Sequence, residues 1–286
     1  MVKFRLSAFS DEYSPEFDKQ IEGLLLNKIH MTELRNIDGT NVSDLTAEQA
    51  KEARRKLDAA GLSVSAIGSP IGKIKITDPM DAHLDKLRNT CEVASIVGTK
   101  RIRMFSFYID DGKYAESQNE VVDRMGQMLD VAEEYGMELI HENEKGIYGD
   151  IGERCLELMQ IFDGRLGCVF DPCNFIQCGS KPFPDCYNML KPYITYMHIK
   201  DCSPHGIVPA GRGTGCLPET LAMINLTHTG DFILTLEPHL RIFDGFDKLE
   251  GDHRQELSNS YATSAEAFEA AVTNLRYCIP KTAECL

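Results

Sequence analysis

Short apolar stretches alternate with longer amphipathic stretches along this chain, and the alternation predicts strand–helix pairs. The apolar stretches span roughly four to eight residues each, the length of a buried strand. Eight strands are predicted, at residues 4–9, 31–35, 62–67, 101–105, 139–143, 167–171, 193–200 and 231–237. Between them apolar residues recur at helical spacing, as at Val122, Met125, Leu129 and Ala132. Eight such units in order predict an α/β fold, a closed parallel (β/α)8 TIM barrel rather than an open sheet.

Local signals predict where several helices begin and end. Start signals stand at Ser14-Pro15, at Asp78-Pro79, and in two capping-box patterns, Thr46 with Gln49 and Asp150 with Glu153. Gly61 is placed to end the helix that Thr46 begins. A final helix is expected at about residues 264–278. The longest irregular stretches follow the last three predicted strands, where the loops of a barrel active site are expected.

The order of side chains within the last two strands predicts which ones face the barrel interior. In the eighth strand Phe232, Leu234 and Leu236 share one face, whereas Ile233, Thr235 and Glu237 share the other. In the seventh strand Met197 and Ile199 alternate in the same way with His198 and Lys200. The uniformly apolar faces suit packing against the outer helices, so the mixed faces point inward and place Glu237 and His198 at the barrel mouth.

Length and composition narrow the class of protein. The 286 residues suit one barrel, so a single domain over residues 1–286 is expected, and no apolar run approaches the length of a membrane span. The first five residues lack the apolar stretch of a signal peptide. Ten cysteines without paired spacing are typical of reduced thiols, which predicts a cytoplasmic protein. The net charge of −14 argues against nucleic acid as a partner and favours a small-molecule enzyme.

Four predicted strands end in a metal-binding side chain: Glu142, Asp171, His198 and Glu237. The carboxyl ends of the strands form the active-site face of a TIM barrel, and neighbouring strands are neighbours in space. We therefore expect the four side chains to converge near the barrel axis. Three carboxylates and one imidazole are a suitable set for a divalent cation, with a preference for the harder ions.

The sequence around these four residues resembles a known family. The stretches His141-Glu142-Asn143-Glu144, Phe170-Asp171-Pro172-Cys173-Asn174, His198-Ile199-Lys200-Asp201 and Glu237-Pro238-His239 are similar to motifs of the sugar phosphate isomerase/epimerase family, the xylose isomerase-like TIM barrels. The resemblance covers nearly the whole chain. It implies that Glu142, Asp171, His198 and Glu237 bind one divalent cation, with Mn²⁺ preferred and Mg²⁺, Co²⁺ or Zn²⁺ as alternatives. Ketose 3-epimerases of the family carry histidine where this chain has Asn174.

The chemistry that the resemblance implies is proton abstraction next to a carbonyl of a carbohydrate substrate. A divalent ion stabilises the enediolate that develops, and a base and an acid act on the substrate. Glu142 and Glu237 are the expected acid/base pair and also metal ligands, while Asp171 and His198 are mainly structural ligands. Barrels of this type are often dimers or tetramers, so by analogy the chain is expected to form a homo-oligomer.

Five further side chains are candidates for substrate contacts: Glu144, Asn174, Lys200, Arg212 and His239. Arg212 lies in a glycine-rich stretch, residues 211–215, that is placed to close over substrate. The alternative for Lys200 and Arg212 is an internal ion pair with a carboxylate such as Asp201. For His239 the alternative is a packed loop residue without a role in binding. Glu33 and Arg35 are expected to form a salt bridge between strands, and His141 a structural hydrogen bond outside the barrel.

Other functions fit the same features less directly. A lyase that dehydrates a keto-inositol or keto-sugar begins with the same proton abstraction, and the sequence does not separate it from an isomerase or epimerase. DNA repair is a third class, because endonuclease IV barrels share this fold, but those enzymes need more histidines and a basic groove. A sugar-binding barrel without turnover is the fourth.

Overall fold

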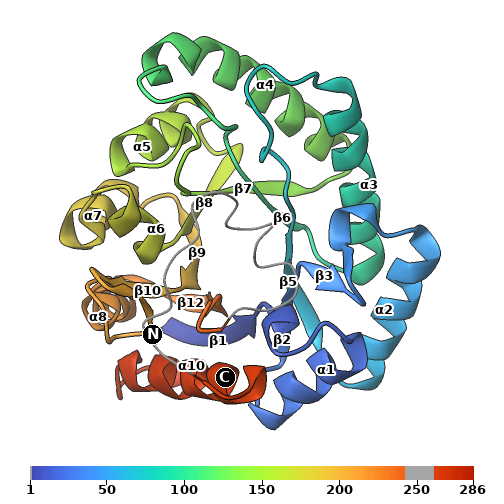
Figure 1. Ribbon diagram of the computed structural model, residues 1–286, viewed down its shortest axis with the longest axis vertical. Helices are drawn as coiled ribbons and strands as arrows, with labels where there is room; N and C mark the ends of the chain where they lie inside the picture. The colour runs from blue at the N-terminus through green and yellow to red at the C-terminus, as the bar shows by residue number, and fades with distance from the viewer. Residues whose placement is uncertain (1, 242–260) are drawn as a thin grey trace.

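A ring of parallel strands forms the centre of this computed structural model, which describes residues 2–241 and 261–286 (Figure 1). Eight strands make the ring: β1 (Val2–Ala8), β2 (Met31–Leu34), β5 (Ser63–Gly68), β6 (Arg101–Met104), β7 (Glu138–Glu142), β8 (Leu166–Phe170), β9 (Ile194–Ile199) and β12 (Gly230–Leu236). Neighbours pair in the order β1-β12-β9-β8-β7-β6-β5-β2. The eight predicted strands and the barrel fold are confirmed, and each strand end lies within two residues of its predicted position.

The ring closes between β1 and β2 through side-chain hydrogen bonds. The Thr32 hydroxyl donates to the Ala8 carbonyl at 3.1 Å and also meets the Ser10 hydroxyl at 3.1 Å. At the other end of β1, the short strand β13 (Glu284–Cys285) pairs with Lys3 and Phe4. β13 is not predictable from the sequence, because its two residues are both exposed and show no alternation of apolar and polar side chains.

Helices surround the ring (Figure 1). They are α1 (Phe17–Leu26), α2 (Ala47–Ala59), α3 (Asp81–Val97), α4 (Tyr114–Glu134), α5 (Gly152–Ile161), α6 (Pro172–Gln177), α7 (Tyr187–Leu190), α8 (Leu217–Thr227) and α10 (Ser264–Cys278). Short turns of helix lie at η1 (Ser10–Glu12), η2 (Val42–Asp44) and η3 (Pro182–Cys186), and two small hairpins pair β3 (Asn36–Ile37) with β4 (Thr40–Asn41) and β10 (Asp201–Ser203) with β11 (Gly206–Val208). Across the described ranges, none of the helices combines the length and apolar character needed to cross a membrane.

The predicted helix starts are confirmed in part. Thr46 and Gln49 form the predicted capping box at the start of α2. The Asp150 pattern was wrong: Ile151 precedes the first residue of α5, and the Asp150 carboxylate pairs with Arg154 instead. Both proline signals lie two residues early, since α1 begins at Phe17 and α3 at Asp81. At Asp150, Arg154 occupies the carboxylate that the pattern assigned to the start of α5.

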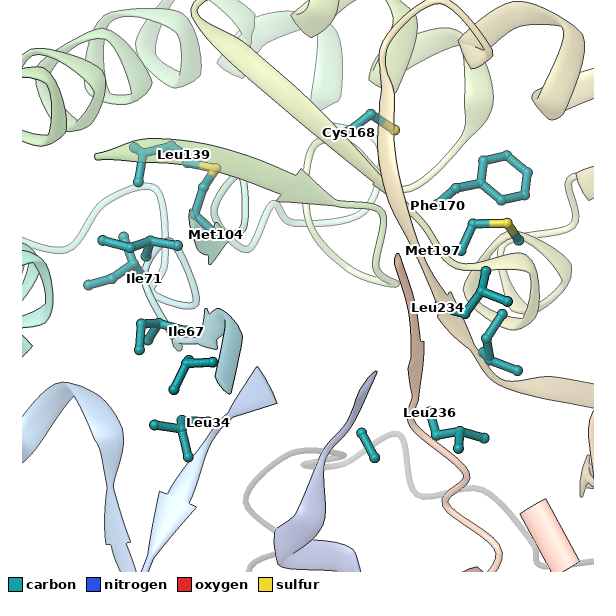
Figure 2. Close-up of a cluster of buried hydrophobic side chains, with 14 of the residues drawn as sticks. Leu34, Ile67, Ile71, Met104, Leu139, Cys168, Phe170, Met197, Leu234 and Leu236 are labelled. Carbon is teal, nitrogen blue, oxygen red and sulfur yellow. The ribbon is translucent and has the colours of Figure 1, made fainter. Parts of the chain in front are cut away.

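Two separate apolar clusters confirm the predicted inward and outward faces. The large cluster lies between the strands and the helices, and Figure 2 shows side chains of several strands that belong to it, among them Leu139, Phe170 and Leu236. The small cluster fills the inside of the ring and consists of Ala66, Ile140, Val169, Tyr196 and Ile233. Phe232, Leu234 and Leu236 belong to the outer cluster, as predicted, and Ile233 to the inner one. Residue 237 lies an even number of positions after Ile233, so its side chain also points into the ring.

All ten cysteines are free thiols in the structure. Seven are buried among strands and helices, and the desolvation that burial imposes raises the pKa of Cys168 to about 12. A thiol with so high a pKa stays protonated at neutral pH and behaves as a small apolar group.

A buried histidine on α3 predicts a pH dependence of stability. His83 accepts a hydrogen bond from the Gly72 N–H at 2.8 Å, and burial, aided by Lys86, lowers its pKa to about 4. Because the folded pKa lies below the unfolded value, its contribution to stability is complete above about pH 6.5 and is lost as the pH falls toward 4. We expect the wild type to lose about 1–2 kcal/mol more unfolding free energy than His83→Gln over this range. Denaturant unfolding of both proteins at several pH values checks this, and parallel curves would contradict it.

Candidate metal centre

Four strand ends bring Glu142, Asp171, His198 and Glu237 together. Glu142 is the last residue of β7, Asp171 follows β8, His198 lies in β9 and Glu237 follows β12. One potential ligand atom of each side chain lies within 4.8 Å of those of the other three, and all four residues are buried. The predicted convergence at the carboxyl end of the ring is therefore found.

The charge balance around this quartet fits a divalent cation. The described residues place six buried carboxylates here, from Asp11, Glu12, Glu33, Glu142, Asp171 and Glu237. Three buried cations, Arg35, Arg103 and Lys200, lie among them, and His198, whose pKa is raised, adds a fourth positive charge, so negative charge is in excess. Burying charge without compensation is costly, and a dication among carboxylate oxygens and one imidazole offsets the excess. The donor set thus suits Mn²⁺, Mg²⁺ or Zn²⁺ on chemical grounds.

The two glutamates of the quartet are held as carboxylates. Burial alone would raise the pKa of Glu142, but His198 and Arg103 oppose it and lower that pKa to about 2. The Arg103 guanidinium lies 2.6 Å from Glu142 Oε2. The pKa of Glu237 also falls well below its ordinary value, because Lys200 and His239 outweigh the effect of burial. Both groups are therefore ionised at neutral pH.

The other two residues of the quartet have raised pKa values. Burial raises the pKa of Asp171 to about 7 against the opposing effect of Lys200. For His198 burial acts to lower the pKa, but the carboxylates of Glu142 and Glu33 raise it well above its ordinary value. Positive charge at this point is thus strongly favoured, and a dication would replace the proton on the imidazole.

Two asparagines fix the backbone between Glu142 and Asp171. Asn143 exchanges two hydrogen bonds of 2.9 Å with the backbone of Asp171, one donated and one accepted. Asn174, a predicted substrate contact, donates to the Asn143 carbonyl at 2.9 Å and to Glu142 Oε1 at 3.4 Å. The Asp171 carboxylate accepts the Asn174 N–H at 3.0 Å and caps α6. The Asn174 amide therefore lies directly beside a predicted ligand.

Lys200 and His239, both predicted substrate contacts, also lie at the quartet. The Lys200 ammonium is 3.2 Å from Asp171 Oδ2 and 3.3 Å from Glu237 Oε2, so its ion pairs are with the quartet rather than with Asp201. His239 has a left-handed backbone (φ 44°), and its Nε2 lies 3.5 Å from both Glu12 and Glu237. The side chains of both residues are buried.

The other two candidates differ in how they relate to the quartet. Glu144 is mostly buried, pairs with Lys73 at 3.3 Å and helps to raise the pKa of Lys200. Arg212 is exposed and donates to Asn274 of α10 at 3.2 Å, so the structure does not bring it to the quartet. The reason is Asp201, whose carboxylate accepts the backbone N–H groups of Gly211, Gly213 and Gly215 at 2.9–3.0 Å. Wrapped around this carboxylate, the loop turns the Arg212 side chain toward the outside of the barrel.

The sequence pattern did not predict the place of several residues at this centre. Arg103 was not considered, although its position in β6 puts it on the inward face opposite Ile102 and Met104. Asp11 and Glu12 lie in η1, three and four residues after the end of β1, so they too follow a strand of the ring. The expected salt bridge between strand ends is found for Arg35, which pairs with Glu237 at 3.2 Å. Outside the ring, His141 makes the expected structural hydrogen bond, with the Ser106 hydroxyl at 2.9 Å.

Comparison with known proteins agrees with this architecture. A family profile described as xylose isomerase-like TIM barrel matches residues 29–258. Among solved structures, the probable 3-DHS dehydratase AsbF of Bacillus anthracis is 18% identical with a TM-score of 0.73, covering 96% of this chain and 98% of that one.

Two further solved structures share the fold at similarly low identity. D-psicose 3-epimerase, solved in the presence of D-fructose, is 14% identical with a TM-score of 0.71, covering 96% of this chain and 97% of its own. The IOLI protein, solved with a bound zinc atom, is 16% identical with a TM-score of 0.70, covering 98% of both chains. No curated protein matches the sequence. Since the family profile spans most of the sequence, the chain belongs to the xylose isomerase-like TIM barrel family.

Proposed function

We propose that this protein is a divalent-metal-dependent isomerase or epimerase of a sugar or sugar phosphate. The observation that carries the proposal is the buried quartet, with four ligand atoms within 4.8 Å of one another at the carboxyl end of the barrel. Enzymes of this fold include a 3-epimerase of the ketose psicose, and one relative holds a zinc atom. Mn²⁺ is the preferred ion here, because three of the four ligands are hard carboxylate oxygens.

The four residues of the quartet hold the metal, and two of them also transfer protons. Glu142, Asp171, His198 and Glu237 hold the cation, which when bound supplies a Lewis acid that polarises a substrate carbonyl. Glu142 and Glu237 stand three strands apart in the ring, so they approach a bound substrate from different sides. Both are ionised, and either can remove the proton from the carbon next to the carbonyl. Return of a proton to the neighbouring carbon gives an isomer, and delivery to the opposite face gives an epimer.

Dehydration of a keto-inositol or keto-sugar is the second candidate. It starts with the same proton abstraction and continues with loss of a β-hydroxyl, for which Glu142 or Glu237 would supply the proton. The similarity to the dehydratase AsbF, which aligns with this chain at a TM-score of 0.73, favours it. The presence of Asn174 supports it as well, since an amide beside Glu142 binds a hydroxyl but carries no proton for transfer.

Deuterium exchange tests the shared first step. We expect the Mn²⁺-loaded protein in D₂O to introduce deuterium next to the carbonyl of at least one sugar in a panel of ketoses, inososes and their phosphates. Mass spectrometry of the recovered sugars detects this. An isomerase or epimerase gives a product whose mass differs from that of its substrate only by the deuterium, whereas a dehydratase gives a product that has lost the mass of water.

Metal content is measured on the same preparations. The wild type is expected to hold near-stoichiometric metal, and His198→Ala to hold much less, because it removes the only nitrogen ligand of the quartet. Arg212→Ala is the matched control, since its side chain is exposed and bonded to α10. A wild type that neither contains metal nor binds added Mn²⁺ contradicts the proposed function. A metal-loaded protein that exchanges no deuterium across the panel supports sugar binding without turnover.

A further inference from the structure

Glu33, a carboxylate outside the quartet, lies on β2 and contacts the imidazole of His198 from the side away from the other three ligands. We propose that Glu33 is a positioning residue for the metal centre: it holds the His198 ring so that Nδ1 faces the cation. The inference rests on the proposed function, because it concerns how this chain prepares one ligand of the proposed site.

The two nitrogens of His198 face opposite partners. Nδ1 lies 2.9 Å from Glu142 Oε1 and 3.6 Å from Glu237 Oε2, so it points into the quartet. Nε2 lies 3.1 Å and 3.2 Å from the two oxygens of Glu33, so it points away from the quartet. A nitrogen that binds a metal must present its lone pair, which leaves the ring proton on the other nitrogen. Glu33 is the acceptor for that Nε2 proton.

Glu33 is itself fixed in place. Its side chain, like that of His198, has no exposed surface. The Tyr196 hydroxyl donates to Glu33 Oε1 at 3.0 Å, and Tyr196 projects into the ring from the same strand as His198. The Phe9 ring meets the imidazole edge-on, with 5.1 Å between centroids. The imidazole therefore has one orientation, with its proton directed at Glu33 and its free nitrogen at the cation.

This role differs from that of a buried ion pair that only supports the fold. A supporting residue would change the unfolding free energy when removed, but not the intrinsic affinity of folded protein for metal. A positioning residue changes the affinity, because an imidazole without its acceptor samples the wrong tautomer and orientation. Removal of such partners costs about 10–100-fold in metal affinity in known sites.

Calorimetric titration with Mn²⁺ at constant pH tests the proposal on metal-free protein, without any assay of activity. Glu33→Ala removes the acceptor, and we expect a Kd about 10–100-fold higher than in the wild type. Glu33→Gln keeps an acceptor oxygen but loses the charge, so its Kd should lie between the two. Ser65→Ala is the matched control: Ser65 is also buried inside the ring, on the neighbouring β5, and bonds Ser7 instead of His198. Its Kd should equal that of the wild type.

Each outcome has a defined meaning. A Mn²⁺ affinity that decreases from the wild type to Glu33→Gln to Glu33→Ala supports the proposal. Thermal unfolding, recorded in parallel, shows whether each variant is folded. Glu33→Ala that folds and binds as tightly as the wild type overturns it. If the alanine variant does not fold, Glu33→Gln decides, and an unchanged Kd for this variant overturns the proposal. A wild type that binds no Mn²⁺ overturns the proposed function instead.

Discussion

We expect Glu237→Gln and Glu142→Gln each to lower kcat by about 10²–10⁴-fold in the metal-loaded protein, because this is the contribution typical of a general acid or base. The substitution keeps the shape of the side chain and one oxygen for the cation, but the amide cannot accept a proton. Both glutamates lie at the quartet, with Oε2 of Glu237 3.6 Å and Oε1 of Glu142 2.9 Å from His198 Nδ1. The variants should therefore fold and bind Mn²⁺ more weakly, and lose turnover even at saturating metal.

Steady-state kinetics at saturating Mn²⁺, on whichever substrate exchanges deuterium, separate loss of chemistry from loss of metal. Arg212→Ala serves as the control, because its exposed guanidinium bonds Asn274 on the outer helix, and its kcat should match that of the wild type. Recovery of full kcat by Glu142→Gln or Glu237→Gln on addition of metal would contradict an acid/base role and leave that residue as a ligand alone.

Strand positions and inward faces follow from the sequence because both depend on local patterns. In β12 the alternation of Leu234 and Leu236 with Ile233 and Thr235 is enough to place residue 237 at the mouth, and the structure has the same phase. The quartet follows in turn, since parallel strands in sequence order bring their carboxyl ends to one face.

Contacts between distant segments could not be predicted in the same way. Arg103 and Glu142 are partners because β6 and β7 are neighbours, yet nothing in either strand states that the guanidinium points at that carboxylate. Arg212 was a reasonable candidate by its place after the seventh strand. Its direction is set by Asp201, which gathers the N–H groups of three glycines and turns the loop outward. Such a cradle depends on three-dimensional geometry that spacing alone does not reveal.

Arg35 is the cation whose removal should cost the most stability. Its side chain is 1% exposed, and it bonds Asp11 through Nε at 2.9 Å and Nη2 at 3.0 Å, Glu12 at 3.3 Å and Glu237 at 3.2 Å. Arg35→Ala leaves these carboxylates buried without their common partner, and removal of one member of a buried ion pair costs about 3–5 kcal/mol. We expect a loss of that size in the unfolding free energy of the metal-free protein, measured with denaturant at neutral pH.

The pH dependence of this loss distinguishes charge from packing. Burial already raises the pKa of Glu12 while Arg35 opposes it, so the Glu12 pKa should rise further in Arg35→Ala. A carboxyl group with a raised folded pKa contributes stability at low pH and loses it as the pH increases, so the deficit of the variant should shrink as the solution is acidified. A deficit that is equal at all pH values would indicate lost packing against Phe9, over which the guanidinium lies at 4.3 Å. Lys3→Ala is the control, because its pair with Glu284 is half-exposed and is expected to contribute about 0–1 kcal/mol at any pH.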